Sequence, residues 1–182
     1  MAEILIVYST TDGHTRRICE RISEEIRTVG HEARLVSLVE DEFVDPSTFD
    51  AVIIGASVRY GKHRPVVRRY IERFVGILSA MPAALFSVNL VARDPAKCVP
   101  EGNPYLQKLL RQISWRPGIL EVFAGKLDYP RYRLGDRLMI KLIMLITHGP
   151  IDVDTVEFTD WDQVAAFGRK IAALAGDSDT HH

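Results

Sequence analysis

Short apolar runs alternate along this chain with segments in which apolar residues recur every three or four positions. Runs such as residues 4–7 are too short and too uniformly apolar for an amphipathic helix, and they are typical of strands buried on both faces of a parallel sheet. The other segments, such as that containing Ile18, Ile22 and Ile26, have the period of a helix with one buried face. This alternation predicts strands at residues 4–8, 32–38, 51–55, 83–90 and 119–124.

Capping residues mark the starts of the predicted helices. Pro65 stands at the favoured first position of a helix whose apolar stripe runs to Leu78. Asn103 is the expected N-cap of the next helix. Asp160 opens the last helix, because Gln163 follows it at the spacing of a capping box.

A loop rich in hydroxyl groups joins the first strand to the first helix. There, backbone N–H groups and the positive end of a helix dipole favour an anion. The loop has no lysine, no Gly-x-x-x-x-Gly-Lys motif and no Gly-x-Gly-x-x-Gly motif. Such neutral donors suit a deeply buried phosphate monoester, for which FMN is the common ligand; the alternative is a turn that only caps the helix. The predicted phosphate-binding residues are Ser9, Thr10, Thr11, Asp12, Gly13, His14 and Thr15.

This loop resembles the flavodoxin signature, in which an apolar pair and an aromatic residue precede hydroxyls, a small residue and a threonine. The resemblance implies a flavodoxin-like α/β fold: a three-layer sandwich around a five-stranded parallel sheet in the order 2-1-3-4-5, with bound FMN. Ligands of such sheets lie beyond the carboxyl ends of the strands. The flavin ring should therefore contact the loops after the third and fourth strands, at Ser57, Val58, Arg59, Tyr60 and Gly61 and at Asn89, Leu90, Val91, Ala92 and Arg93.

Three residues of the first of these loops have a predicted role at the ring. Tyr60 could stack on it, and Gly61 would allow a close approach of the backbone. Arg59 would favour the reduced, anionic flavin. For Tyr60 and Arg59 the alternatives are an ordinary loop aromatic and a solvated charge.

Composition agrees with one globular enzyme domain over residues 1–176, followed by a disordered polar tail at 177–182. The chain has 182 residues, of which 47% are hydrophobic, and a formal net charge of −1. This charge gives no global field to attract nucleic acid, and it lacks the strong acidity of a soluble flavodoxin electron carrier. Two distant cysteines indicate neither a metal site nor a disulfide framework. No secretory leader is recognisable, so we expect a cytoplasmic protein.

A basic and apolar stretch, residues 126–153, separates the fifth strand from the last helix. On a helix its basic residues would follow one another at spacing four, opposite most of the apolar residues of the run 138–146. This run is too short for a bilayer, which needs about 20 residues, but suits the membrane interface. The alternative is a helix that covers the domain, because Ile140 and Met144 fall on the charged side. One interpretation of residues 154–158 is that they resume strand five, which would make the stretch an insertion.

Several separate motifs together resemble the menaquinone-dependent protoporphyrinogen IX dehydrogenases of bacterial haem synthesis. The motifs are GASVRYG at 55–61, SVNLVAR at 87–93, SWRP at 114–117, YPRYR at 129–133, MIKLIM at 139–144 and TDW at 159–161. The resemblance implies removal of six electrons from protoporphyrinogen IX in three rounds, each passed to a membrane quinone, menaquinone or ubiquinone. It also implies a peripheral protein on the cytoplasmic face of the bacterial inner membrane.

Basic residues are the candidates for holding the two propionates of that substrate or the membrane surface. Arg93 could form charge-assisted pairs with the propionates, and surface ion pairing is the alternative for any one arginine. We assign no catalytic residue, because a flavin can accept a hydride without a strong protein base. The further candidates for substrate or membrane contact are Arg116, Arg131, Arg133, Arg137 and Lys141.

Two other functions stay open from the sequence alone. An NAD(P)H:quinone reductase could use the same scaffold, although no dinucleotide motif is present. A flavodoxin-like electron carrier would dock protein partners, whereas the weak net charge and the basic, apolar stretch favour a membrane reactant. A homo-oligomer is a further possibility.

Overall fold

Five parallel strands form the central sheet, as the sequence predicts. The computed structural model describes residues 1–41, 43–128, 138, 140–142, 144, 145 and 155–178. The strands lie in the order β2-β1-β3-β5-β6, which is the predicted order 2-1-3-4-5. Their bounds are β1 (Glu3–Ser9), β2 (Glu32–Ser37), β3 (Ala51–Arg59), β5 (Ala83–Asn89) and β6 (Ile119–Ala124).

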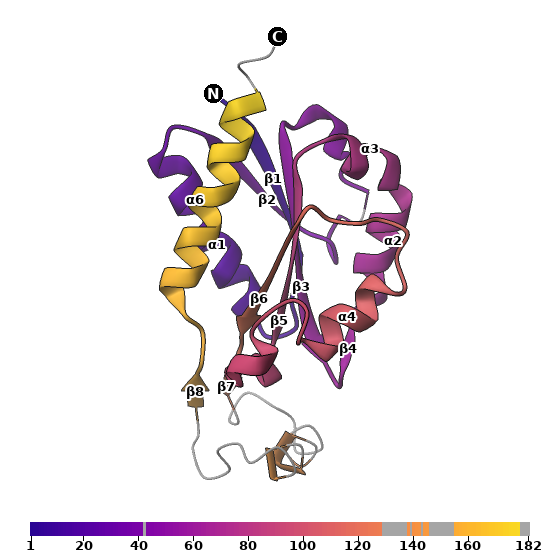
Figure 1. Ribbon diagram of the computed structural model, residues 1–182, viewed down its shortest axis with the longest axis vertical. Helices are drawn as coiled ribbons and strands as arrows, with labels where there is room; N and C mark the ends of the chain where they lie inside the picture. The colour runs from indigo at the N-terminus through magenta and orange to yellow at the C-terminus, as the bar shows by residue number, and fades with distance from the viewer. Residues whose placement is uncertain (42, 129–137, 139, 143, 146–154, 179–182) are drawn as a thin grey trace.

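Helices cover both faces of this sheet (Figure 1). One face is covered by α1 (His14–Thr28) and α6 (Trp161–Ser178). The other is covered by α2 (Pro65–Arg73), α3 (Val75–Ala80) and α4 (Pro104–Leu110). Because side chains alternate along a strand, β1 contributes Leu5 and Val7 to one core and Ile4 and Ile6 to the other. The three-layer sandwich therefore has two hydrophobic cores.

Short elements complete the described chain. Three 3-10 helices lie in the connections: η1 (Pro46–Thr48), η2 (Leu90–Arg93) and η3 (Pro95–Lys97). The strand β4 (Lys62–His63) pairs antiparallel with the end of β3. Beyond β6, β7 (Lys126–Asp128) and β8 (Thr155–Glu157) form a separate antiparallel ladder.

The interpretation of residues 154–158 as a continuation of strand five is wrong. Residues 155–157 form β8, which pairs with β7 and not with the central sheet. Gly125 separates β7 from β6, and its carbonyl accepts a hydrogen bond from the Phe158 backbone N at 3.1 Å. The start of the basic stretch is thus joined, at the carboxyl edge of the sheet, to residues 155–158, which follow the stretch.

Two helix boundaries also differ from the prediction. The single helix expected from Pro65 to Leu78 is divided at Phe74, whose φ of −109° and ψ of 19° are not helical. The last helix continues through residues 177 and 178, which the polar composition of the tail predicts to be disordered. Residues 179–182 lie outside the described residues.

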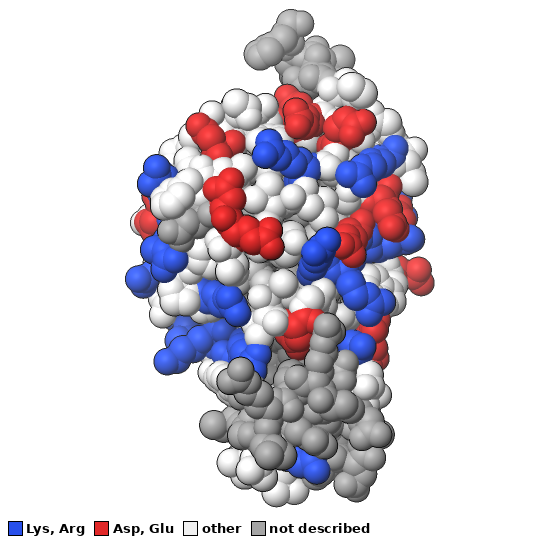
Figure 2. All heavy atoms as spheres, turned by 180° about the vertical axis from the view of Figure 1, so that it is seen from behind, with Lys and Arg blue, Asp and Glu red and all other residues white. Residues whose placement is uncertain are grey.

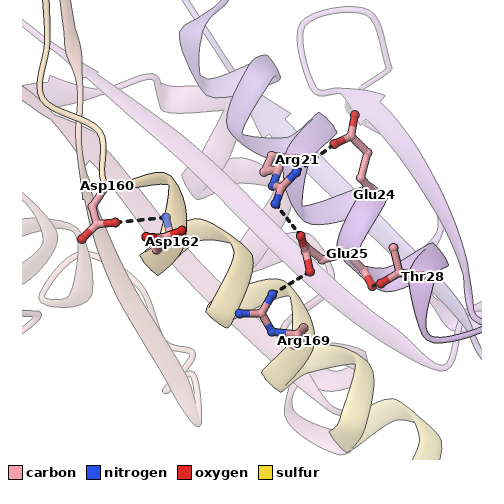
Figure 3. A network of polar contacts seen from close by, with 7 residues as sticks. All are labelled: Arg21, Glu24, Glu25, Thr28, Asp160, Asp162 and Arg169. Carbon is pink, nitrogen blue, oxygen red and sulfur yellow. Dashed lines mark hydrogen bonds and ion pairs between the residues drawn. The ribbon is translucent and has the colours of Figure 1, made fainter.

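A polar network joins the helices α1 and α6 (Figure 3). The Glu25 carboxylate accepts from Arg21 of its own helix and from Arg169 of α6, both at 2.7 Å. The helices approach closely here, since a Cβ added at Gly168 would lie 3.0 Å from the Cβ of Glu25. Asp160 caps α6 by accepting from the backbone N of residues 162 and 163. Only half of the predicted capping box forms, because the Gln163 side chain binds Glu121 and the Val122 carbonyl instead.

Candidate functional site

A cleft opens at the carboxyl edge of the central sheet, where the neighbouring strands β1 and β3 end. Its enclosed volume is about 120 Å³, and the rest of the cleft is open to solvent. Its walls come mainly from the loop between β1 and α1, the end of β3 with the turn after it, and the segment after β5; residues 57–59, predicted in a loop, belong to β3 itself. Its lining residues are Thr11, Asp12, His14, Thr15, Ser57, Val58, Arg59, Tyr60, Gly61, Val88, Asn89, Leu90, Val91, Arg93, Tyr105, Gly125, Lys126 and Ile140.

The loop between β1 and α1 has the geometry of an anion cradle. Gly13 lies in the left-handed region at φ 85°, which lets the chain turn directly into the helix at His14. The Thr10 hydroxyl is used within this turn, where it accepts from the Gly13 backbone N at 3.0 Å. The backbone N–H groups of the first turn of α1, which have no partner within the helix, therefore point toward the cleft.

Buried polar side chains with no hydrogen-bond partner among the described residues surround this loop. Three are hydroxyls, on Ser9, Thr11 and Ser57, and the fourth is Nδ1 of His14. Buried polar atoms in native proteins are nearly always hydrogen-bonded, so four such atoms close together in the chain's fold indicate a ligand that supplies the missing partners. Hydroxyl donors and helix N–H groups fit the phosphate monoester of the expected FMN.

His14 is fixed in one orientation by its other ring nitrogen. Its Nε2 lies 2.6 Å from Thr159 Oγ1, and that hydroxyl donates its hydrogen to the Ala124 carbonyl at 2.8 Å. Thr159 must therefore accept from the Nε2–H of His14. Burial lowers the pKa of His14, with Glu157 opposing the shift and Arg17 adding to it. In the neutral ring, Nδ1 is an acceptor for a donor that the described residues do not supply.

The loop after β3 presents a flat aromatic side chain at the mouth of the cleft. Tyr60 has a φ of 50°, the one positive φ outside glycine among the described residues, and its side chain is 48% exposed. Gly61 follows at φ 71°, and Tyr105 lies 3.5 Å from where its Cβ would be. The Arg59 guanidinium stands over the Tyr60 ring at 5.2 Å from its centroid. Such strained backbone is common where a loop contacts a ligand.

A buried amide pair holds the loop after β5. The side chains of Asn89 and Asn103 bind each other in both directions, at 3.1 and 3.3 Å. Asn89 also binds Ser87 Oγ at 3.1 Å, and Nε2 of His63 lies 2.9 Å from the same oxygen. Burial lowers the pKa of His63 to about 4, so this ring is neutral near pH 7. The loops after β3 and β5 are thus linked through one polar network.

Most of the predicted flavin-binding residues line the cleft, and four do not. Ser9 lies beneath the loop with a buried, unpartnered hydroxyl, and Thr10 shapes the turn. Gly13 lines an adjoining hollow between Asp12 and Arg16. Ala92 is buried, and its backbone N–H donates a hydrogen bond to Oδ1 of Asn89.

Five lining residues were missed by the sequence analysis: Val88, Tyr105, Gly125, Lys126 and Ile140. Lys126 supplies the cation that the first loop lacks, since it lines both the cleft and the hollow beside Gly13. The rule that ligands lie at the carboxyl ends of strands could have found Gly125 and Lys126, which follow β6. Tyr105 had no such signal, because its spacing on α4 is that of a core residue.

The basic substrate candidates are not brought together among the described residues. Arg116 precedes β6, at the end of the sheet opposite the cleft. Its guanidinium donates to the carbonyls of Leu110, Ile113 and Trp115 at 2.8 to 3.2 Å, so it closes the end of α4. Lys141 is exposed and does not line the cleft. The other three candidates, Arg131, Arg133 and Arg137, lie outside the described residues.

Comparisons with known proteins agree with this architecture. Residues 5–154 match a family model described as a flavodoxin domain. The chain is 43% identical over 171 residues to the protoporphyrinogen IX dehydrogenase [quinone] of Escherichia coli strain K12, covering 93% of this chain and 94% of that protein. The chain belongs to the protoporphyrinogen IX dehydrogenase family of flavodoxin-domain proteins. A member of this family from Leishmania major is 39% identical over 172 residues, covering 93% of this chain and 74% of the relative.

Solved structures of flavodoxin-like proteins share the fold of this chain but little of its sequence. Oxidised Flavodoxin 1 from Bacillus cereus has a TM-score of 0.56 at 13% identity, covering 94% of this chain and 98% of that one. A WrbA-like protein from Agrobacterium tumefaciens has a TM-score of 0.56 at 13% identity, covering 97% and 99%. A Fusobacterium nucleatum flavodoxin bound to flavin mononucleotide has a TM-score of 0.51 at 12% identity, covering 98% and 97%.

Proposed function

We propose that this protein binds FMN and oxidises protoporphyrinogen IX to protoporphyrin IX, with a quinone as electron acceptor. The observation that carries the proposal is the 43% identity over nearly the whole length of a protoporphyrinogen IX dehydrogenase [quinone]. The cleft supports it independently, because its unpartnered hydroxyls suit the phosphate of a flavin nucleotide.

Each wall of the cleft has a part in this proposal. When bound, FMN would supply the chemistry of accepting two electrons and a proton from the substrate in each round. Thr11 and Ser57 would hold its phosphate at the start of α1, with the buried hydroxyl of Ser9 beneath them. Tyr60 and the loop after β5 would hold its ring in place, and Arg59 would provide a positive charge beside it. The protein then orients the reactants, and a strong protein base is not needed.

Anaerobic conversion of protoporphyrinogen IX tests this function directly. The FMN-loaded protein is given the substrate with and without a menaquinone or ubiquinone analogue, and porphyrin fluorescence is followed. Fluorescence that depends on quinone supports the proposal, and the better analogue identifies the acceptor. Rapid reduction of the flavin by a nicotinamide, with no porphyrin formed, would instead identify an NAD(P)H:quinone reductase.

We also propose that the protein binds peripherally to the cytoplasmic face of the bacterial inner membrane. Residues 138, 140–142, 144 and 145 are helical, and we call them the insertion helix. Three leucines on it are exposed: Leu138 at 71%, Leu142 at 54% and Leu145 at 61%. Lys141 lies exposed among them. An apolar face with a basic residue suits the interface of an anionic bilayer.

The opposite side of the insertion helix faces the protein. Met144 is fully buried against Leu127, with Ile140 and Phe158 beside them. The two residues that intrude on the charged side in the sequence are therefore the ones that anchor the helix, and the leucines remain outside. Among the described residues, no helix has both the length and the apolar character needed to span a bilayer. The possible homo-oligomer stays a prediction, which the molar mass in solution would test.

A further inference from the structure

A second groove adjoins the flavin cleft, and the two share Gly61 as a lining residue. It lies between the start of α2, the strand β4 and the outer side of α4. Four of its lining side chains are cationic: Lys62, Arg64, Arg68 and Lys108. No carboxylate is among its lining residues, so we call it the basic groove.

The four cations of the basic groove form no ion pair within the described chain, and the nearby Glu72 has its pKa lowered first by hydrogen bonds from Ser114 and only then by the charge of Arg68. The acid one turn beyond Arg68 is Glu72, but its carboxylate accepts from the backbone N and hydroxyl of Ser114 at 2.7 and 2.8 Å. On the face shown in Figure 2, lysines and arginines gather at the lower left beside the grey segment. A groove with one sign of charge attracts anions.

The walls of this groove are anchored to the core. His63 lies 2.9 Å from Ser87 Oγ of β5, and β4 pairs with the end of β3. Pro65 fixes the first turn of α2, and the buried Leu109 holds α4 against the sheet. The backbone that carries the cations is therefore held in place by the core.

We propose that the basic groove receives the propionate carboxylates of the porphyrinogen, an inference that rests on the proposed function. The reacting carbon must lie against the flavin ring, so the macrocycle occupies the apolar part of the cleft. The carboxylates on one edge of the macrocycle then need cations beside the cleft, and the groove joins it at Gly61. Arg116, which the sequence suggested for this role, lies at the opposite end of the sheet. The carboxylate class of ligand follows from Lys and Arg donors without competing acids.

The test compares protoporphyrinogen IX with its dimethyl ester, which has the same macrocycle and no carboxylate charge. The variants are Lys62→Gln, Arg68→Gln and Lys108→Gln, all at exposed side chains. Each should raise KM for the diacid about three- to fivefold, as expected for one exposed charge pair. Turnover at saturation and KM for the ester should stay within about twofold. Lys170→Gln, at an exposed lysine of α6, is the matched control and should change neither KM.

Three results distinguish carboxylate binding from other roles of the groove. If the variants leave KM for the diacid unchanged, or raise KM for both substrates equally, the basic groove does not bind the carboxylates. If they weaken binding to phosphatidylglycerol vesicles while KM is unchanged, the groove contacts lipid, and the inference is equally overturned. FMN content and the circular dichroism spectrum show whether each variant is folded. Failure of the unaltered protein to form any porphyrin would overturn the proposed function itself, which is a distinct result.

Discussion

Gly55 in the middle of β3 shows how closely the sheet and the aromatic core are packed. A Cβ added there would lie 2.5 Å from the tip of the Phe86 ring. Phe86 is fully buried and makes edge contacts with Phe123 and Phe167, with ring centroids 5.2 and 5.9 Å away, so it cannot easily move. We therefore expect Gly55→Ala to lower the free energy of unfolding by about 1–3 kcal/mol through overpacking.

The control for this substitution is Gly76→Ala in α3. No atom lies within 4 Å of a Cβ added at Gly76, so alanine should be neutral there or should stabilise the helix by about 0.5–1 kcal/mol. Urea unfolding of both variants measures the difference. Equal stability of the two variants would show that Phe86 relaxes freely.

The unpartnered hydroxyls of the cleft predict opposite effects on cofactor binding and on folding. Thr11→Val and Ser57→Ala each remove a donor to the phosphate, so FMN affinity should fall about tenfold or more. The same changes remove a buried polar atom without a protein partner, so the apoprotein should be no less stable. Fluorescence titration with FMN and unfolding of the apoprotein measure the two effects.

Ser23 offers a matched control for these variants. Its hydroxyl is also buried and unpartnered among the described residues, but it lies on α1 away from the cleft. Ser23→Ala should therefore leave FMN affinity unchanged. Loss of affinity in all three variants would point to a general effect on the fold and would contradict a specific role of Thr11 and Ser57 in binding the phosphate.

The buried ring of His63 predicts how stability depends on pH. Its pKa is lowered to about 4 in the folded protein, against an ordinary value of 6.5. Between these values the unfolded chain binds more protons than the folded one, so His63 makes stability fall as pH decreases from 6.5 toward 4. The full difference is on the order of 3 kcal/mol. The free energy of unfolding of the apoprotein, measured at several pH values, should change less steeply with pH in His63→Gln than in the unaltered protein. An equal slope in both proteins would show that His63 is not the source of this pH dependence.

At the scale of elements, the sequence predicted strands better than the connections between them. The predicted fifth strand, 119–124, agrees in both bounds with β6, whose second half, Val122 to Ala124, is buried. The break at Phe74 had no signal, since both halves of the helix keep their apolar spacing and packing alone decides where it divides. The pairing of β8 with β7 could not be predicted either, because short polar strands carry no hydrophobic pattern.

The exposed face of the insertion helix makes a prediction about membrane binding. Replacing Leu138, Leu142 and Leu145 together by serine removes most of the exposed apolar surface of this helix while Met144 keeps its contact with the protein. Affinity for phosphatidylglycerol vesicles, measured by co-sedimentation, should fall about tenfold or more. Serine at the exposed Val29, Val39 and Val99 is the matched control, which should sediment like the unaltered protein. Equal binding by both triple variants would contradict a role for this helix at the membrane.

For the whole molecule, the rule that ligands lie at the carboxyl ends of strands predicts where the cleft lies, but not all of its walls. The loops after β3 and β5 were found because they follow recognisable strands. Tyr105 and Ile140 were missed because they come from helices whose position depends on how the chain folds around the cleft. Arg116 was misplaced for a related reason, since its charge indicated a ligand while its actual partners are backbone carbonyls.

A ligand that joins loops from both halves of the sheet should stabilise the molecule as a whole. FMN would contact the loop before α1 and the loops after β3 and β5, which separate on unfolding. At a concentration 100 times its Kd, a ligand specific for the folded state adds about 2.7 kcal/mol. For a domain of this size that raises Tm by about 5–10 °C. Riboflavin, which has the same ring and no phosphate, should raise Tm less at equal concentration, because the hydroxyls at Ser9, Thr11 and Ser57 remain unpartnered. Thermal unfolding with each ligand measures the difference, and an equal shift with both would mean that the loop before α1 does not bind the phosphate.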